Sequence, residues 1–276
     1  MMKGTSFIKA SLLAGGMLFM LCVQAQELYV FTEPASNMPS HSISGKITGK
    51  YSKHHDATNN MQRYTPEIMF GLNKKWMLHF ASTFSDMYTR NVRWESARTY
   101  LKYRFFSNDD VHKHFRMAAF GEYSYSRNIG IYDDIGIEGD MGGFQGGLVA
   151  TQLWNKLAVS STLSYLQTHQ NKSTEVIVYI PKKAVNYSLS AGYLVFPLNY
   201  KNFSQTNFNV YAELLGQRTL DMKKYVVDFA PAVQFIFNSN AKLNVGYRFQ
   251  LSGNMYRMAE KSWLISFERT FLGAWK

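Results

Sequence analysis

The stretch Val185-Asn-Tyr-Ser-Leu-Ser-Ala-Gly-Tyr-Leu-Val195 alternates between two kinds of side chain. Val185, Tyr187, Leu189 and the later odd positions are apolar or aromatic, whereas Asn186–Gly192 carries small or polar residues at its even positions. Successive side chains of a β-strand point to opposite faces, so this pattern predicts a strand with one apolar and one polar face. A tilted strand needs about 9–11 residues to cross a bilayer, and strands of soluble proteins are nearer 5–6 residues, so the length favours a membrane-spanning strand.

The same period of two recurs along the rest of the chain. It predicts twelve strands, at 42–51, 63–72, 75–89, 94–106, 113–127, 141–154, 157–169, 184–197, 206–217, 224–237, 241–251 and 262–272. Short connections such as Asn155–Lys156 alternate with longer ones such as Asn128–Asp140. In hydrocarbon every backbone N–H and C=O needs an internal partner, so a spanning sheet must close on itself. We therefore expect an all-β fold, an antiparallel up-and-down transmembrane barrel of about twelve strands with both termini on one side.

Composition excludes several other classes. The chain has 276 residues, of which 46% are hydrophobic, 16% aromatic and only 18% charged. No run of about 18 apolar residues is present, which excludes a helical membrane protein. So many aromatic residues also exclude a disordered chain. The 30 Lys and Arg residues exceed the 19 Asp and Glu residues, but they are scattered rather than gathered among stacking aromatics, so we expect no nucleic-acid partner.

The first 25 residues have the pattern of a signal peptide. Lys3 and Lys9 supply a positive start, Ala10–Val23 is apolar, and Ala25 ends a cleavage pattern. The sole cysteine, Cys22, follows the large Leu21 rather than a small residue, so we expect simple cleavage and not lipidation. The prediction is a signal peptide at 1–25, an extended segment at 26–40 in the periplasm or inside the lumen as a small plug, and a barrel domain at 41–276.

With these features the chain resembles a Gram-negative outer-membrane β-barrel protein of the porin or transporter kind. The resemblance is architectural and covers the signal peptide and about 40–272. The last strand, Trp263–Phe271, resembles the carboxy-terminal signal read by the barrel-assembly machinery, although Leu272–Lys276 follow it. The resemblance implies the outer membrane as location, with its lipid, lipopolysaccharide and the barrel-assembly machinery as partners. Pro66 and Pro231 fall within predicted strands, where each removes a ladder donor, so we expect bulges or strand ends there.

Charged residues within the strands are predicted to face the lumen, because a charge at mid-depth on the lipid face is costly. These candidate pore-lining residues are Glu67, Asp86, Arg98, Lys102, Arg104, Arg116, Glu122, Glu213, Asp228, Arg248 and Glu268. Two interpretations are open. The charges form ion pairs that fill a narrow interior, or Lys102, Arg104 and Arg116 form a basic strip that faces acids across a polar pore.

Catalytic and metal sites are not predicted. His41 and Ser42 are neighbours that point to opposite faces, so they cannot form a proton relay with each other. The His54-His55-Asp56 and Asp109–His114 clusters (the latter with His112 and His114) have ligand-type residues, but solvated turns explain them as well, and we expect no metal and no cofactor.

The function predicted from the sequence is passive passage of small polar or charged solutes. The alternatives are a closed structural or adhesive barrel and an outer-membrane hydrolase that modifies lipid.

Overall fold

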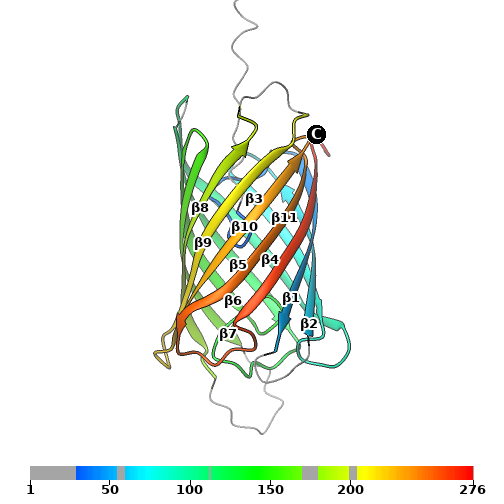
Figure 1. The fold of residues 1–276 in the computed structure, drawn as a ribbon, viewed down its shortest axis with the longest axis vertical. Coiled ribbons are helices and arrows are strands. Elements are labelled where there is room, and N and C mark those ends of the chain that lie inside the picture. Colours follow the sequence, from blue (N-terminus) through cyan, green and yellow to red (C-terminus); the bar gives the residue numbers. More distant parts are fainter. Residues whose placement is uncertain (1–28, 55–59, 112, 170–179, 199–203, 276) are drawn as a thin grey trace, which may run out of the picture.

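The structure is a computed structural model that describes residues 29–54, 60–111, 113–169, 180–198 and 204–275. The predicted signal peptide lies outside the described residues. Twelve strands form one closed antiparallel barrel in which each strand pairs with its neighbours in sequence and β1 pairs with β12 (Figure 1). The strands are β1 (Ser42–Lys53), β2 (Asn60–Gly71), β3 (Trp76–Ser85), β4 (Arg93–Asp109), β5 (Lys113–Ser126), β6 (Gly142–Trp154), β7 (Leu157–His169), β8 (Lys183–Phe196), β9 (Asn207–Thr219), β10 (Tyr225–Phe237), β11 (Ala241–Gly253) and β12 (Lys261–Phe271). The predicted fold class is confirmed.

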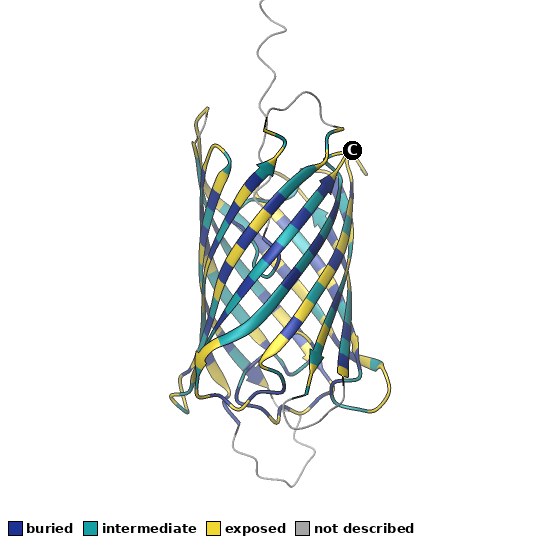
Figure 2. Ribbon diagram, viewed as in Figure 1, coloured by how far each residue is buried: buried dark blue, intermediate teal, exposed yellow. Residues whose placement is uncertain are grey.

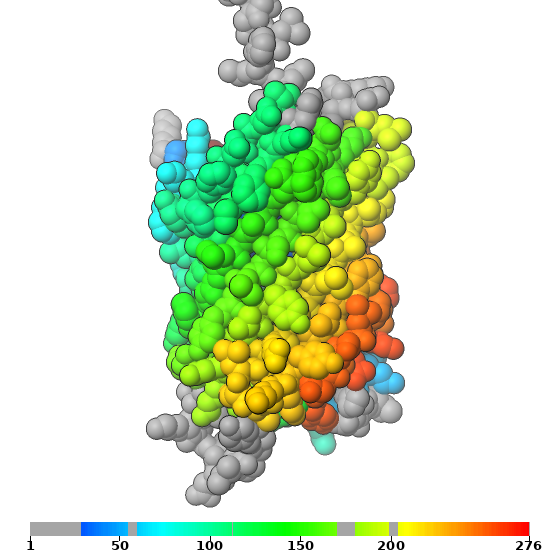
Figure 3. Space-filling view, turned by 90° about the vertical axis from the view of Figure 1, so that its left-hand side faces the viewer, coloured from blue at the N-terminus to red at the C-terminus, as the bar shows by residue number. Residues whose placement is uncertain are grey.

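Burial alternates along the strands, as Figure 2 shows by its bands of colour. On β7, Leu163 is 60% exposed and Ser164 is buried; on β8, Leu189 is 51% exposed and Ser190 is buried. The exposed members of the alternation form an apolar outer surface, while the buried members are mostly polar. Figure 3 shows one face of the molecule as a space-filling view. A soluble barrel would have the reverse arrangement, so this outer surface is one that suits lipid. No helix in the described part of the chain is long and apolar enough to cross a membrane.

The two prolines do not cause bulges, contrary to expectation. Pro66 pairs with Ile47 of β1, but the ladder between β2 and β3 skips from Tyr64 to Glu67 with no change of register. Pro231 likewise interrupts the β10–β11 ladder without shifting it. Each proline lacks a donor on one side only, so the chain loses local pairing with one neighbour and keeps the strand.

We call the two ends of the barrel the turn side and the loop side. Both the start of β1 and the C-terminal residues lie on the turn side, at the top of Figure 1, where Ala274 N donates to His41 O. The connection Arg127–Met141 between β5 and β6 lies on the loop side and folds into the lumen, where Ile135 and Ile137 are buried against Leu166. Residues 29–40 precede β1 and lie inside the barrel, whereas residues 26–28 of the predicted segment lie outside the described residues.

Candidate functional site

The N-terminal segment 29–40 occupies the turn-side half of the lumen, and the carboxylate of Glu213 holds one part of it. Val30 N and Phe31 N donate to Glu213 Oε1 at 3.0 and 2.9 Å. The hydroxyl of Thr32 donates to Glu213 Oε2 at 2.7 Å. Glu213, on β9, is fully buried, so these charge-assisted hydrogen bonds replace the water that this carboxylate has lost.

Lys102 on β4 holds the next part of the segment. Its Nζ donates to the carbonyl oxygens of Pro34 and Ser36 at 2.8 and 2.9 Å and lies 3.5 Å from a carboxylate oxygen of Glu33. The lysine is fully buried. Its ammonium is therefore satisfied by the backbone of the segment rather than by an acid on the barrel wall.

Further contacts fix the middle of the segment. Ala35 N donates to Thr151 Oγ1 at 2.9 Å, and Arg116 donates to Ser36 Oγ at 2.9 Å. The Ala35 methyl is buried against Ala118 and Val149. Small residues on both sides allow this close packing of the segment against β5 and β6.

A chamber of about 450 Å³ lies between the segment and the Arg127–Met141 connection. Val30, Phe31, Thr32 and Glu33 form part of its lining from the turn side. From the loop side it is lined by residues of the connection between Tyr132 and Met141. A volume of this size is within the range of sites for small molecules.

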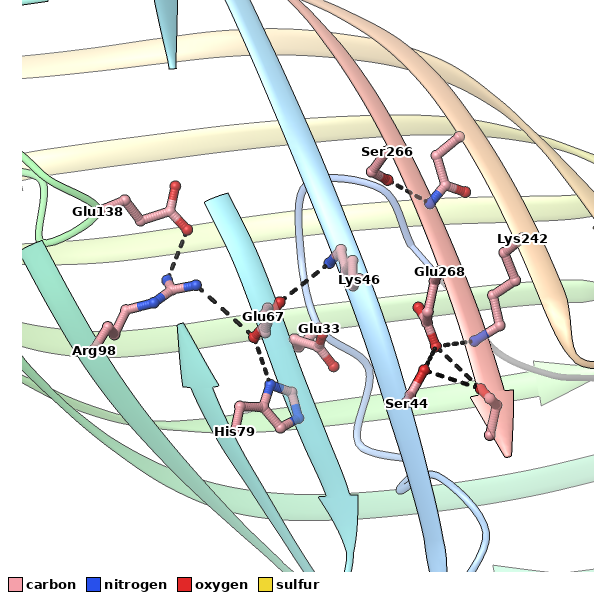
Figure 4. Close-up of polar contacts among 12 residues, drawn as sticks. Glu33, Ser44, Lys46, Glu67, His79, Arg98, Glu138, Lys242, Ser266 and Glu268 are labelled. Atoms are coloured by element: carbon pink, nitrogen blue, oxygen red, sulfur yellow. Dashed lines mark hydrogen bonds and ion pairs between the residues drawn. The ribbon is translucent and has the colours of Figure 1, made fainter. Parts of the chain in front are cut away.

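One wall of the chamber carries a network of ion pairs, shown in Figure 4. Glu67 on β2 lies 3.8 Å from Lys46 Nζ on β1, 2.9 Å from His79 Nδ1 on β3 and 4.0 Å from Arg98 on β4. Arg98 also approaches Glu122 on β5 at 2.9 Å. Lys46 and Glu67 face each other directly in the β1–β2 ladder. The contacts of Glu67 with His79 and of Arg98 with Glu122 are diagonal, and Glu67 reaches Arg98 across β3.

The Arg127–Met141 connection is held to this wall by its acids. Arg98 NH1 donates to Glu138 at 2.7 Å, and Arg63 on β2 makes a paired contact with Asp140 at 2.6 and 3.2 Å. The nearby Arg98 guanidinium keeps the pKa of the Glu138 carboxyl below its ordinary value. Burial raises the pKa of Asp134, which lies 3.3 Å from Arg257.

The opposite wall of the chamber is largely uncharged. It presents hydroxyl and amide side chains from β7, β8 and β9: Thr162, Ser164, Asn186, Ser188 and Gln217. Gln217 donates to Ile135 O at 2.7 Å and receives a hydrogen bond from Ile135 N, so it also holds the connection in place. The chamber therefore has a charged side, whose acids and bases pair with one another, and a neutral polar side.

The predicted pore-lining residues divide into groups. Glu67, Arg98, Glu122 and Arg248 line the chamber. Lys102, Arg116 and Glu213 contact the N-terminal segment, as described above. The others lie elsewhere: Asp228 pairs with Arg248 and Arg257, Glu268 pairs with Lys242, Arg104 donates to Lys74 O in the β2–β3 turn, and Asp86, just beyond β3, accepts from Gln62 N. Lys102, Arg104 and Arg116, the bases of the predicted basic strip, are therefore not part of the chamber lining.

Sequence reasoning missed several chamber residues. Lys46 and Lys50 share the inward parity of Ser44 and Thr48 on β1, and Arg63 shares that of Glu67 on β2, so alternation alone was able to identify them. The acids of the Arg127–Met141 connection carry no such signal, because their positions depend on how an irregular segment folds back.

The candidate metal clusters fall partly outside the described residues, which exclude His55, Asp56 and His112. His54 Nε2 lies 2.9 Å from Tyr132 Oη, and His114 Nδ1 lies 2.9 Å from Asp109. Among the described residues, no group of three or more His, Cys, Asp or Glu side chains is arranged to hold a metal ion.

Comparison with known proteins gives structural likeness only. No family model matches the sequence, and no curated protein matches it. The fold is similar to that of an outer membrane channel from Pseudomonas putida F1, with a TM-score of 0.58 and 13% identity, over 88% of this chain and all (100%) of the other. It is also similar to the KdgM porin, with a TM-score of 0.52 and 10% identity, over 83% of this chain and 99% of the other. At such identities the likeness shows a shared fold, the closed antiparallel β-barrel.

Proposed function

We propose that this protein is an outer-membrane channel that gives passive passage to small polar or charged solutes, and that its own residues 29–40 close the turn-side half of the lumen. The observation that carries the proposal is the polar chamber inside a barrel whose outer surface is apolar. A barrel that served only as a support has no need of a cavity lined by charged side chains of both signs.

The outer surface supports the proposed location. Aromatic residues such as Trp76, Trp94 and Trp263 are exposed near the ends of their strands, where rings favour the two headgroup interfaces. Outer-membrane lipid and lipopolysaccharide would contact this surface, and the barrel-assembly machinery would insert the strands. These partners are part of the proposal.

In this channel, solutes from the loop side reach the chamber and meet the segment. Passage to the turn side then requires the segment to leave Glu213 and Lys102, because the segment lies in that half of the lumen and is held there from β4 and β9. The segment acts as an internal gate, and its docking equilibrium sets how often the channel is open.

A closed structural barrel is the second candidate, and the same contacts favour it. Glu213 and Lys102 are fully buried, and releasing the segment would leave two charges exposed in a narrow lumen. If the segment never leaves, the chamber is a blind pocket and no solute crosses.

Single-channel conductance in a planar bilayer distinguishes the two candidates. The mature protein is compared with a variant that lacks residues 29–40, and heat-dependent gel mobility confirms that both are folded. For a gated channel we expect brief openings in the mature protein and stable, larger steps in the deletion variant. If neither folded protein conducts ions, the proposed channel is rejected.

A further inference from the structure

Lys50, on β1, stands apart from the other bases that line the chamber. Five of those bases each have a carboxylate at 3.8 Å or less. They are Lys46, Arg63, Arg98, Arg248 and Arg257. Lys50 lines the same chamber but has no hydrogen-bond or ion-pair partner among the described residues.

The acids that line the chamber do not supply the missing partner. Glu67, Glu122, Glu138 and Asp140 are each engaged with bases of the network described above. Asp134 pairs with Arg257, Glu33 lies near Lys102, and Glu260, the remaining acid of the lining, is engaged elsewhere. The chamber wall thus leaves one ammonium without a counter-ion.

The strand register increases this local positive charge. Lys50 lies directly opposite Arg63 in the β1–β2 ladder, and like charges in that position repel each other. Arg63 is occupied by Asp140 at 2.6 Å and by Glu95 at 3.6 Å. An anion beside Lys50 would relieve the repulsion that remains.

A second unpartnered group lies on the same face of β1. Ser52, two residues beyond Lys50, also lines the chamber, and its hydroxyl is buried without a hydrogen-bond partner. An oxyanion is the ligand that takes a hydrogen bond from an ammonium and a hydroxyl together. Residues i and i+2 of a strand point to the same side, which places both donors toward the same part of the chamber.

We infer that Lys50 and Ser52 form a binding subsite for the oxyanion of a small solute, a carboxylate or a phosphate group. The subsite lies toward the loop side, because β1 runs from the turn side at Ser42 to the loop side at Lys53. It deepens the proposed function, and its meaning for transport rests on that function. A solute that enters from the loop side would be held by its anionic group before it reaches the segment.

The test is a calorimetric titration of the refolded, mature protein with inorganic phosphate and, separately, with acetate and citrate at constant ionic strength. We expect saturable binding of at least one probe, and the probe that binds shows whether phosphate or carboxylate is preferred. Lys50→Gln should weaken that binding about tenfold, as the loss of one charge-assisted hydrogen bond implies. Lys50→Arg should retain most of it, and Ser52→Ala should weaken it by a smaller factor.

Lys53→Gln is the matched control. It removes the same charge from the same strand, at an exposed position outside the chamber lining, and should leave binding unchanged. No saturable binding in the folded protein, or equal loss in the Lys50→Gln and Lys53→Gln variants, would overturn the inference. Conductance is read separately, so a barrel that binds a probe but never conducts loses the proposed function and keeps the subsite.

Discussion

The two halves of the lumen satisfy their buried charges in different ways. On the turn side, Glu213 and Lys102 bind the backbone of residues 29–40, which lie inside the lumen there. Around the chamber, Glu67, Arg98 and their neighbours bind one another (Figure 4), and a cavity of about 450 Å³ remains beside them. The same inward alternation produces both halves. The difference teaches that an inward charge binds the backbone of the chain where a segment reaches it. In the proposed channel, the charges that no segment reaches are the ones available to a solute.

The largest effect is expected from Glu213→Gln. The neutral amide keeps the shape of the side chain but weakens three hydrogen bonds to the segment, at a cost of about 3 kcal/mol, or roughly a hundredfold in the docking equilibrium. We expect a much higher open probability in planar bilayers. Glu268→Gln is the control, because Glu268 also faces the lumen but pairs with Lys242 instead of the segment. Equal behaviour of the two variants would show that the halves do not differ as described.

Arg98→Gln tests the chamber half. It leaves Glu122, Glu138 and Glu67 with one base fewer, so the channel should prefer cations more strongly, as read from the reversal potential under a salt gradient. The free energy of unfolding should fall by about 2–3 kcal/mol, because charges in a mostly buried network lose their partner. Arg104→Gln, on the same strand but outside the chamber lining, should change neither quantity appreciably. An unchanged reversal potential in Arg98→Gln would mean that the ion pairs of the chamber do not influence ion selectivity.

Asp86→Ala tests the barrel wall, which surrounds both halves of the lumen. Asp86 accepts a hydrogen bond from Gln62 N at 2.8 Å just beyond β3, and its loss should lower the free energy of unfolding by about 1 kcal/mol. Open probability and selectivity should stay constant, since neither lumen half is touched. A change in either would mean that the wall and the lumen contents are coupled.

The smallest expected effect is on the pH dependence of the melting temperature. Arg98 lowers the pKa of Glu138 in the folded protein, so this pair stabilises the folded state above the ordinary glutamate pKa of about 4.3, and the contribution is lost as pH falls through the lower folded value. The melting temperature of the wild type should therefore drop more on acidification than that of Glu138→Gln. The difference should be small, because the Glu138 side chain is 60% exposed and water screens the pair. Parallel pH curves for the two proteins would contradict it.

The strands were predictable because lipid imposes a period of two on their sequences. The β6 strand, predicted at 141–154, is observed at Gly142–Trp154, and the β7 strand was predicted at its observed bounds, Leu157–His169. The prolines at 66 and 231 show the limit of that rule, because a missing donor has two structural outcomes, a bulge or a gap in one ladder.

The candidate site was predictable only in part. The alternation of side chains along the strands predicted that Lys102 and Glu213 point into the lumen. It did not predict that they bind the segment 29–40 there. The segment 29–40 has no period of its own, since it is neither strand nor helix, and its path depends on side chains from β4, β8 and β9. The contacts of Asp134, Glu138 and Asp140 likewise depend on the fold, which brings Arg257, Arg98 and Arg63 to them.

The covalent link between the segment and β1 has one more consequence. Ser40 and His41 join the docked residues to Ser42, the first residue of β1, so the segment cannot diffuse away when it leaves Glu213. Its local concentration at the lumen site is of millimolar order or above, as for other short tethers. Individually weak contacts are therefore enough to keep the lumen occupied most of the time. A free peptide of the same sequence would have to reach a similar concentration before it competed.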